Sequence, residues 1–183
     1  MDSSITLVNP GSPTSYFLNA ADPKNIIVYA HPSDPLYQIE MEAGQIKIID
    51  AHHPSRVLAI IHHKGLRPDT LSFPARGEKS VISTQKWLKK TKLPDGTVVH
   101  VMDTENGSYM WKVHSSFCQK IYQYGDLETE VACCRWQHAH GKPALVLEYG
   151  AEPLRDVIII GYFVQRHKIT MEERAIDVFV GPW

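Results

Sequence analysis

The sequence has little cysteine, no long apolar run and almost no net charge. Its one wholly apolar stretch, Val157 to Val164 (VIIIGYFV), has eight residues, whereas a helix needs about 20 to span a bilayer. We therefore expect this stretch to be buried inside the protein. The formal net charge is −1, so no global field favours nucleic acid or anionic membranes, and any basic surface must be local.

The three cysteines are Cys118 and the adjacent pair Cys133 and Cys134. An odd number argues against a secreted domain held by disulfides and favours reduced thiols in the cytosol. The first residues, MDSSITLVNPGSPTSYF, also lack the charged and apolar regions of a secretory signal, so we predict a cytoplasmic protein. Neighbouring residues of a strand point to opposite faces, which predicts one cysteine of the pair in the core and the other outside.

Short segments rich in Val, Ile, Tyr, Phe or Thr recur between turn residues and predict strands. The predicted strands are Ile5–Val8, Ser15–Leu18, Asn25–His31, Leu36–Glu42, Gln45–Ala51, Arg56–His63, Thr70–Phe73, Lys79–Ser83, Thr97–Met102, Ser108–His114, Cys118–Tyr124, Glu130–Trp136 and Ala144–Tyr149.

The clearest hairpin signal is Asn106-Gly107, between two of these segments. Several strands alternate polar and apolar residues, as antiparallel sheets with one wet face do. No repeat, linker or low-complexity tract is visible, so we predict a single domain over residues 1–183. Many short strands at this spacing indicate a sandwich or a barrel.

The apolar stretch near the C-terminus can be a buried strand or a buried helix. Its flanks favour a helix: Pro153 and Asp156 suit the first turn, and the basic residues 166–168 suit the last. We predict a helix over Leu154–Lys168, about 22 Å long at 1.5 Å per residue. A helix that is apolar on all sides must be surrounded, and a closed antiparallel barrel around it also removes exposed sheet edges.

The pattern resembles the tubby-like barrel superfamily, which includes tubby C-terminal domains, plant LURP-one-related proteins and phospholipid scramblases. Three features carry the resemblance: the order of the strands, the aromatic hairpin Gly107–Lys112 (GSYMWK), and Pro153–Asp156 (PLRD) before the apolar run. More narrowly, the chain is similar to small uncharacterised proteins of mushroom-forming fungi. The shared sequence motifs are an Asn-Pro pair near the start, a strand with Leu-Tyr-Gln-Ile, a strand with Arg-Val-Leu-Ala-Ile-Ile-His, and then Tyr-x-Trp-Lys.

The resemblance covers roughly Asn9 to Met171 and implies a barrel of about twelve strands threaded by a hydrophobic helix. Tubby domains bind phosphoinositides through clustered basic residues, but that cluster has no position-by-position match here. The transmembrane stretch and calcium site of scramblases have no equivalent either, which disfavours scramblase activity.

A basic stretch from Lys79 to Lys92 is the strongest local charge asymmetry. Its lysines near an anionic leaflet would each contribute about 1 kcal/mol, and tryptophan prefers the interface. The alternative is a solvated loop, or an edge strand protected by lysines. Nucleic acid is a weaker candidate, because one aromatic residue offers little stacking surface. The candidate ligand-binding residues are Lys86, Trp87, Lys89, Lys90 and Lys92.

The ten histidines include the pairs His52-His53 and His62-His63, and His138 and His140 in an H-x-H spacing. The H-x-H pair is a weak candidate for a metal site, because Gly141 follows it directly and a turn would separate the rings. No established metal motif is present, and we expect no cofactor.

Catalytic signals are diffuse, since no nucleophile elbow, phosphate loop or dinucleotide motif occurs. An enzyme could still be assembled at a barrel mouth from His31, His62, Asp69, Tyr109 or His140. Tyr109 and Trp111 are more simply read as rim and core residues.

Three hypotheses follow. The first is a non-catalytic barrel that binds a lipid headgroup or a small amphipathic or anionic ligand. The second is a small isomerase, cyclase or lyase acting on an apolar metabolite in a barrel-end pocket. The third is a protein-interaction module.

Overall fold

The computed structural model describes residues 11–22, 24–65, 67–77, 81–115, 118–137 and 141–180, with the backbone alone at 20, 137 and 172–180. These residues form thirteen strands in one antiparallel sheet and a long C-terminal helix. The strands are β1 (Thr14–Asp22), β2 (Asn25–His31), β3 (Asp34–Glu42), β4 (Gln45–Asp50), β5 (Val57–Lys64), β6 (Arg67–Ser72), β7 (Val81–Ser83), β8 (Leu88–Lys92), β9 (Val98–Thr104), β10 (Gly107–Ser115), β11 (Cys118–Gln123), β12 (Glu130–Gln137) and β13 (Lys142–Leu147).

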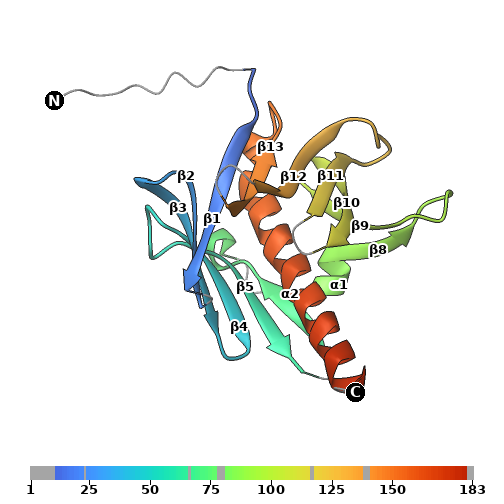
Figure 1. The fold of residues 1–183 in the computed structure, drawn as a ribbon, viewed down its shortest axis with the longest axis horizontal. Helices are drawn as coiled ribbons and strands as arrows, with labels where there is room; N and C mark the ends of the chain where they lie inside the picture. Colours follow the sequence, from blue (N-terminus) through green and yellow to red (C-terminus); the bar gives the residue numbers. More distant parts are fainter. Residues whose placement is uncertain are drawn as a thin grey trace.

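The sheet consists of two meanders, β1 to β7 and β8 to β13, which are joined where β1 pairs with β13. Figure 1 shows strands of the two meanders on opposite sides of the C-terminal helix α2 (Arg155–Val180), which runs between them. The predicted mainly β architecture around a C-terminal helix is therefore confirmed. Closure into a barrel is not: β7 and β8 are the two edges of the sheet, and no ladder joins them among the described residues.

The two edge strands are connected by the short helix α1 (Thr84–Trp87). A hydrogen bond from Thr84 Oγ1 to the carbonyl oxygen of Asp69, 3.1 Å long, attaches α1 to β6. We call the interval between β7 and β8, bridged by α1, the seam. At the seam the sheet is interrupted by this helical turn, which contacts β6, β7 and β8.

The predicted strands that fall within the described residues are all present, and the turn at Asn106 joins β9 to β10 as expected. The predicted strand Ile5–Val8 lies outside the described residues. Strand β8 was not predicted as a separate strand, because three lysines in five residues give it low β-propensity. It is an edge strand carrying lysines, in agreement with one of the two readings of the basic stretch.

The prediction of a buried axial helix is confirmed for Val157–Val164: every residue from Ile158 to Val164 is buried in α2. The predicted end at Lys168 is wrong, because α2 continues to Val180. No glycine or proline interrupts the chain between Gly161 and Gly181, so the basic residues 166–168 lie within the helix.

The start of α2 agrees with the prediction. Pro153 lies in a 3-10 turn, η2 (Glu152–Leu154), and Asp156 lies in the first turn of α2. None of the described helices has the length and apolar character needed to cross a membrane.

The prediction for the adjacent cysteines is wrong in one respect. Cys134 belongs to the main core, but Cys133, which alternation places on the other face of β12, is buried too. It lies beside Glu130, which forms an ion pair with Lys120, the residue opposite Cys133 on β11. Trp111 is in the core as predicted, and the buried Tyr109 donates a hydrogen bond to the Asn106 carbonyl oxygen.

Candidate ligand-binding cleft

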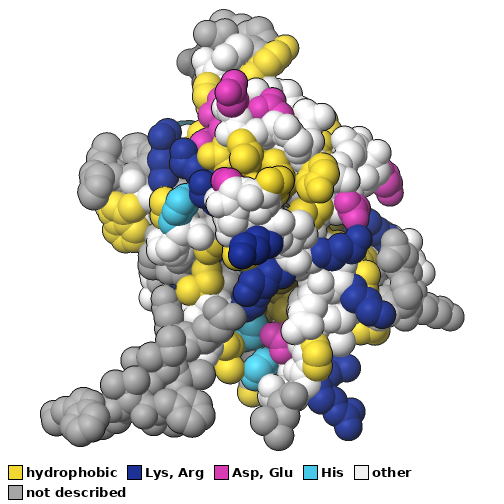
Figure 2. All heavy atoms as spheres, turned by 90° about the vertical axis from the view of Figure 1, so that its right-hand side faces the viewer, with side chains coloured by type: hydrophobic (Ala, Val, Ile, Leu, Met, Phe, Trp, Pro, Cys, Tyr) yellow, Lys and Arg dark blue, Asp and Glu magenta, His cyan; other side chains and the backbone are white. Residues whose placement is uncertain are grey.

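A cleft of about 700 Å³ opens at the seam, beside residues 164–171 of α2. We call it the seam cleft. Its walls come from β5, β6, α1, β8, β9 and α2, through the residues Ile61, His63, Gly65, Arg67, Asp69, Thr84, Gln85, Leu88, Lys90, His100, Val164, Gln165, His167, Lys168 and Met171. On the face in Figure 2, histidine side chains and an acidic group lie in a hollow, with Lys and Arg side chains around it.

Strand alternation explains why these residues share the cleft. On β6, Arg67 and Asp69 lie on the same face as Leu71, which is fully buried. On β8, Lys90 lies on the same face as the buried Leu88. On both strands, the side chains that face inward are therefore apolar near the core and charged near the opening of the cleft.

Basic side chains predominate among the charged groups of the cleft. Arg67, Lys90 and Lys168 line it, against the single carboxylate of Asp69. None of these three cations forms an ion pair with a carboxylate in the described part of the chain. Arg67 and Lys90 are exposed and Lys168 is half-buried. Three neighbouring cations without a carboxylate partner attract an anion.

The pKa of His100 is affected by these positive charges. It lies opposite Lys90 in the β8–β9 ladder, and its Nε2 is 3.3 Å from Nζ of Lys168. Burial, and then the charges of Lys168 and Lys90, lower the pKa of His100 to about 4. The imidazole is therefore neutral near pH 7, and its Nε2 can accept a hydrogen bond from the Lys168 ammonium group.

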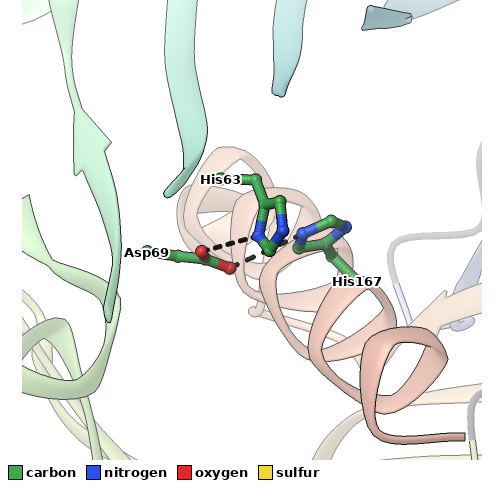
Figure 3. Close-up of side chains that lie close together, drawn as sticks. All are labelled: His63, Asp69 and His167. Atoms are coloured by element: carbon green, nitrogen blue, oxygen red, sulfur yellow. Dashed lines mark hydrogen bonds and ion pairs between the residues drawn. The ribbon is translucent and has the colours of Figure 1, made fainter. Parts of the chain in front are cut away.

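Three half-buried side chains meet at the wall of the cleft: His63 at the end of β5, Asp69 on β6 and His167 on α2 (Figure 3). The Nδ1 atom of His63 is 2.9 Å from Oδ1 of Asp69, and Nε2 of His167 is 3.5 Å from Oδ2. We call these residues the histidine–aspartate cluster. A carboxylate that orients two imidazoles can hold protons or bind a metal ion.

A second hollow, of about 520 Å³, adjoins the cluster from the side of the β3–β4 hairpin. It shares Ile61, His63, His167 and Met171 with the seam cleft and adds Glu42 and Arg166. The cluster thus lies between two hollows near the C-terminal half of α2.

The structure divides the predicted lysine–tryptophan stretch. Lys90 lines the seam cleft, whereas Lys89 points to the other face of β8 and forms an ion pair with Asp103 at 2.9 Å. Trp87 is half-buried and packs on Phe73, with ring centroids 5.9 Å apart. Lys86 and Lys92 are exposed, and neither lines the cleft.

Of the catalytic candidates that the structure describes, only Asp69 lines the cleft. His62 occupies the position between two cleft residues of β5, Ile61 and His63, so it points to the opposite face. Tyr109 lines neither hollow, and the exposed His31 contacts Ser33. The weak metal candidates His138 and His140 lie outside the described residues.

His63 and His167 were not predicted from the sequence as partners of Asp69. The position of His63 could have been predicted, because it follows Ile61 on the inward face of an alternating strand. The position of His167 could not, because its basic neighbours indicated the end of the helix. Only the packing of α2 against the β5–β6 hairpin brings the three together.

The fold and the cleft define a mainly β protein with a helix enclosed by one sheet and a polar opening at the seam. The chain belongs to a family of proteins of unknown function, DUF6593, whose family model matches residues 21–171. The matched range includes the whole histidine–aspartate cluster. No curated protein and no solved structure matches the chain.

Proposed function

We propose that this protein is a non-catalytic binding module for a small amphipathic anion, which lies in the seam cleft. The observation that carries the proposal is the combination, in one cleft, of three cations without a described carboxylate partner and an apolar floor. The floor consists of Ile61, Leu88 and Val164, all of which belong to the main core.

The volume and composition of the cleft support this proposal. Pockets for small molecules typically measure about 300–1,000 Å³ and combine apolar walls with a few convergent polar groups. In the seam cleft, the anionic group would contact Lys90 and Lys168, and the apolar part would extend towards Leu88 and Val164. A free amphiphile and a single lipid headgroup share this chemistry.

Isothermal titration with decanoate tests the proposal, with decanol as the uncharged probe of equal chain length and inorganic phosphate as the anion without a chain. We expect decanoate to bind more tightly than either. Co-sedimentation with phosphatidylserine vesicles separates binding of a lipid in a bilayer from binding of a free amphiphile.

Adjacent positions of β8 provide matched variants. Lys90→Glu reverses a charge inside the cleft, whereas Lys89→Glu reverses one on the opposite face. Loss of a charge-assisted hydrogen bond costs about 1.5–3 kcal/mol, so Lys90→Glu should weaken decanoate binding about tenfold or more. Lys89→Glu should leave it unchanged. Equal weakening by both variants, or no preference for decanoate over decanol, contradicts the proposal.

We also propose that the fold is a variant of the tubby-like barrel, opened at the seam. The buried apolar helix and the sheet that surrounds it on both sides support this kinship. A cytosolic location is part of the same proposal and is supported by the three free thiols.

A further inference from the structure

We propose that His63, Asp69 and His167 form a binding site for a divalent first-row transition-metal ion of the zinc or iron(II) type. The site goes beyond the binding of an amphipathic anion and does not depend on it. Its three donors come from three separate elements, β5, β6 and α2, and their ligand atoms all lie within 4.8 Å of one another.

The donor atoms lie near the spacing that a metal ion requires. Ligand atoms about 2.1 Å from an ion in tetrahedral or octahedral positions lie about 3.0–3.4 Å from each other. Nδ1 of His63 is 2.9 Å from Oδ1 of Asp69, and Nε2 of His167 is 3.5 Å from the other carboxylate oxygen, Oδ2. The three ligand atoms lie within 4.8 Å of one another, so binding requires side-chain rotations that bring one carboxylate oxygen and both ring nitrogens closer together.

The donor set identifies the class of ion. Two imidazoles and one carboxylate are the ligands of mononuclear zinc and non-haem iron(II) sites, in which the remaining positions stay open to water or a ligand. All three side chains line the seam cleft, so the open positions would face it. Each is half-buried, and an ion can therefore reach the site from solvent.

Among the surrounding groups, one backbone N–H supports the carboxylate ligand, whereas three cations oppose a divalent ion unless an anionic ligand binds with it. The backbone N–H of Lys64 donates to Oδ1 of Asp69 at 3.3 Å and orients the carboxylate, as outer-sphere hydrogen bonds do in metal sites. The Nζ atom of Lys168 lies beside His100. Arg67, Lys90 and Lys168 would favour an anionic fourth ligand on the ion.

The competing explanation is a purely structural clamp, in which Asp69 fixes two histidines by hydrogen bonds and joins α2 to the β5–β6 hairpin. Both explanations predict that substitutions in the cluster lower stability. Only a metal site predicts saturable binding of one equivalent of ion, with a signal that comes from the ion itself.

Titration of the tag-free protein with cobalt(II) tests the inference, because the visible absorption of cobalt(II) changes with its ligands. We expect one equivalent to bind and zinc(II) to displace it. Loss of an outer-sphere partner commonly costs 10–100-fold in metal affinity, so His167→Gln, His63→Gln and Asp69→Asn should each weaken binding by at least about 100-fold. His62→Gln, the neighbouring histidine on the opposite face of β5, is the matched control and should bind as tightly as the wild type.

A measurement on the wild type alone guards against variants that fail to fold. Manganese(II) should broaden amide NMR signals around residues 63–64, 67–69 and 164–170, and leave those of β10 and β11 sharp. The inference is overturned if no equivalent of cobalt(II) binds, if His62→Gln weakens binding as much as the cluster variants, or if broadening is greatest elsewhere.

Discussion

Gly161 of α2 packs directly against the indole of Trp111 on β10. A Cβ atom added at Gly161 would lie 2.3 Å from Cζ3 and 2.6 Å from Cη2 of that ring. Trp111 is itself held in place, since it is 1% exposed and its Nε1 donates to Oε1 of the buried Gln119 at 2.8 Å. The glycine lets the helix approach the sheet closely at this point.

Gly161→Ala should therefore destabilise the protein, although alanine is normally better than glycine within a helix by about 1 kcal/mol. Overpacking of a filled core costs about 1–3 kcal/mol, and urea unfolding measures the change. Trp111→Phe removes the contacted part of the indole, so Gly161→Ala should cost less in the Trp111→Phe background. An unchanged or higher stability of Gly161→Ala in the wild-type background contradicts the predicted contact.

Tyr37→Phe tests the anchor at the start of α2. The Tyr37 hydroxyl donates to Asp156 Oδ1 and accepts from Arg155 Nε at 2.7 Å. Removal of the hydroxyl leaves the buried end of this network incomplete and should lower the free energy of unfolding by about 1–2 kcal/mol. Chemical denaturation measures the loss. Gln38→Ala, next to Tyr37 but bonded only to Glu40 among the described side chains, should have a smaller effect.

The three thiols should react at very different rates. Cys118 is exposed, whereas Cys133 and Cys134 are buried. The pKa of both buried thiols is raised to about 12, mainly by burial and, for Cys133, also by the nearby Glu130. At about pH 8, a thiol reagent should modify one cysteine quickly in the native protein and three after unfolding. Rapid modification of two thiols in the folded state would contradict the burial of Cys133 or Cys134.

The imidazole of His100 should remain neutral well below its usual range. Because its folded pKa of about 4 lies below the usual pKa of 6.5 for histidine, its neutral state contributes stability above pH 6.5. That contribution is lost as the pH falls from 6.5 towards 4. Lys168→Met removes one of the two neighbouring charges and should raise the pKa of His100, which imidazole NMR signals report directly. A pKa that does not move means that Lys168 does not act on His100.

The individual strands and turns could be predicted because they depend on short-range patterns in the sequence. Alternation along β3 and the Asn106-Gly107 turn each fix an element without reference to distant residues. The start of α2 was also accessible, because Pro153 and Asp156 are typical of a first helical turn. Closure of the sheet could not be predicted from such patterns, because it depends on whether the two edge strands form hydrogen bonds with each other.

The site depended on contacts that the sequence does not display. Asp69 was a candidate on its own, but its partners lie on a different strand and on the helix. The lysine-rich β8 was misleading because alternation sends Lys89 and Lys90 to opposite faces. A charge cluster in sequence is therefore not a charge cluster in space.

The proposed function requires that ligands enter at the seam. Amide NMR shifts of the metal-free protein, titrated with decanoate, test this requirement most directly. The largest changes should lie on β6, α1, β8 and residues 164–171 of α2, and Lys90→Glu should reduce them. Amide shift changes concentrated instead around the exposed residues Trp136 and Tyr149, with the seam unaffected, would contradict entry at the seam.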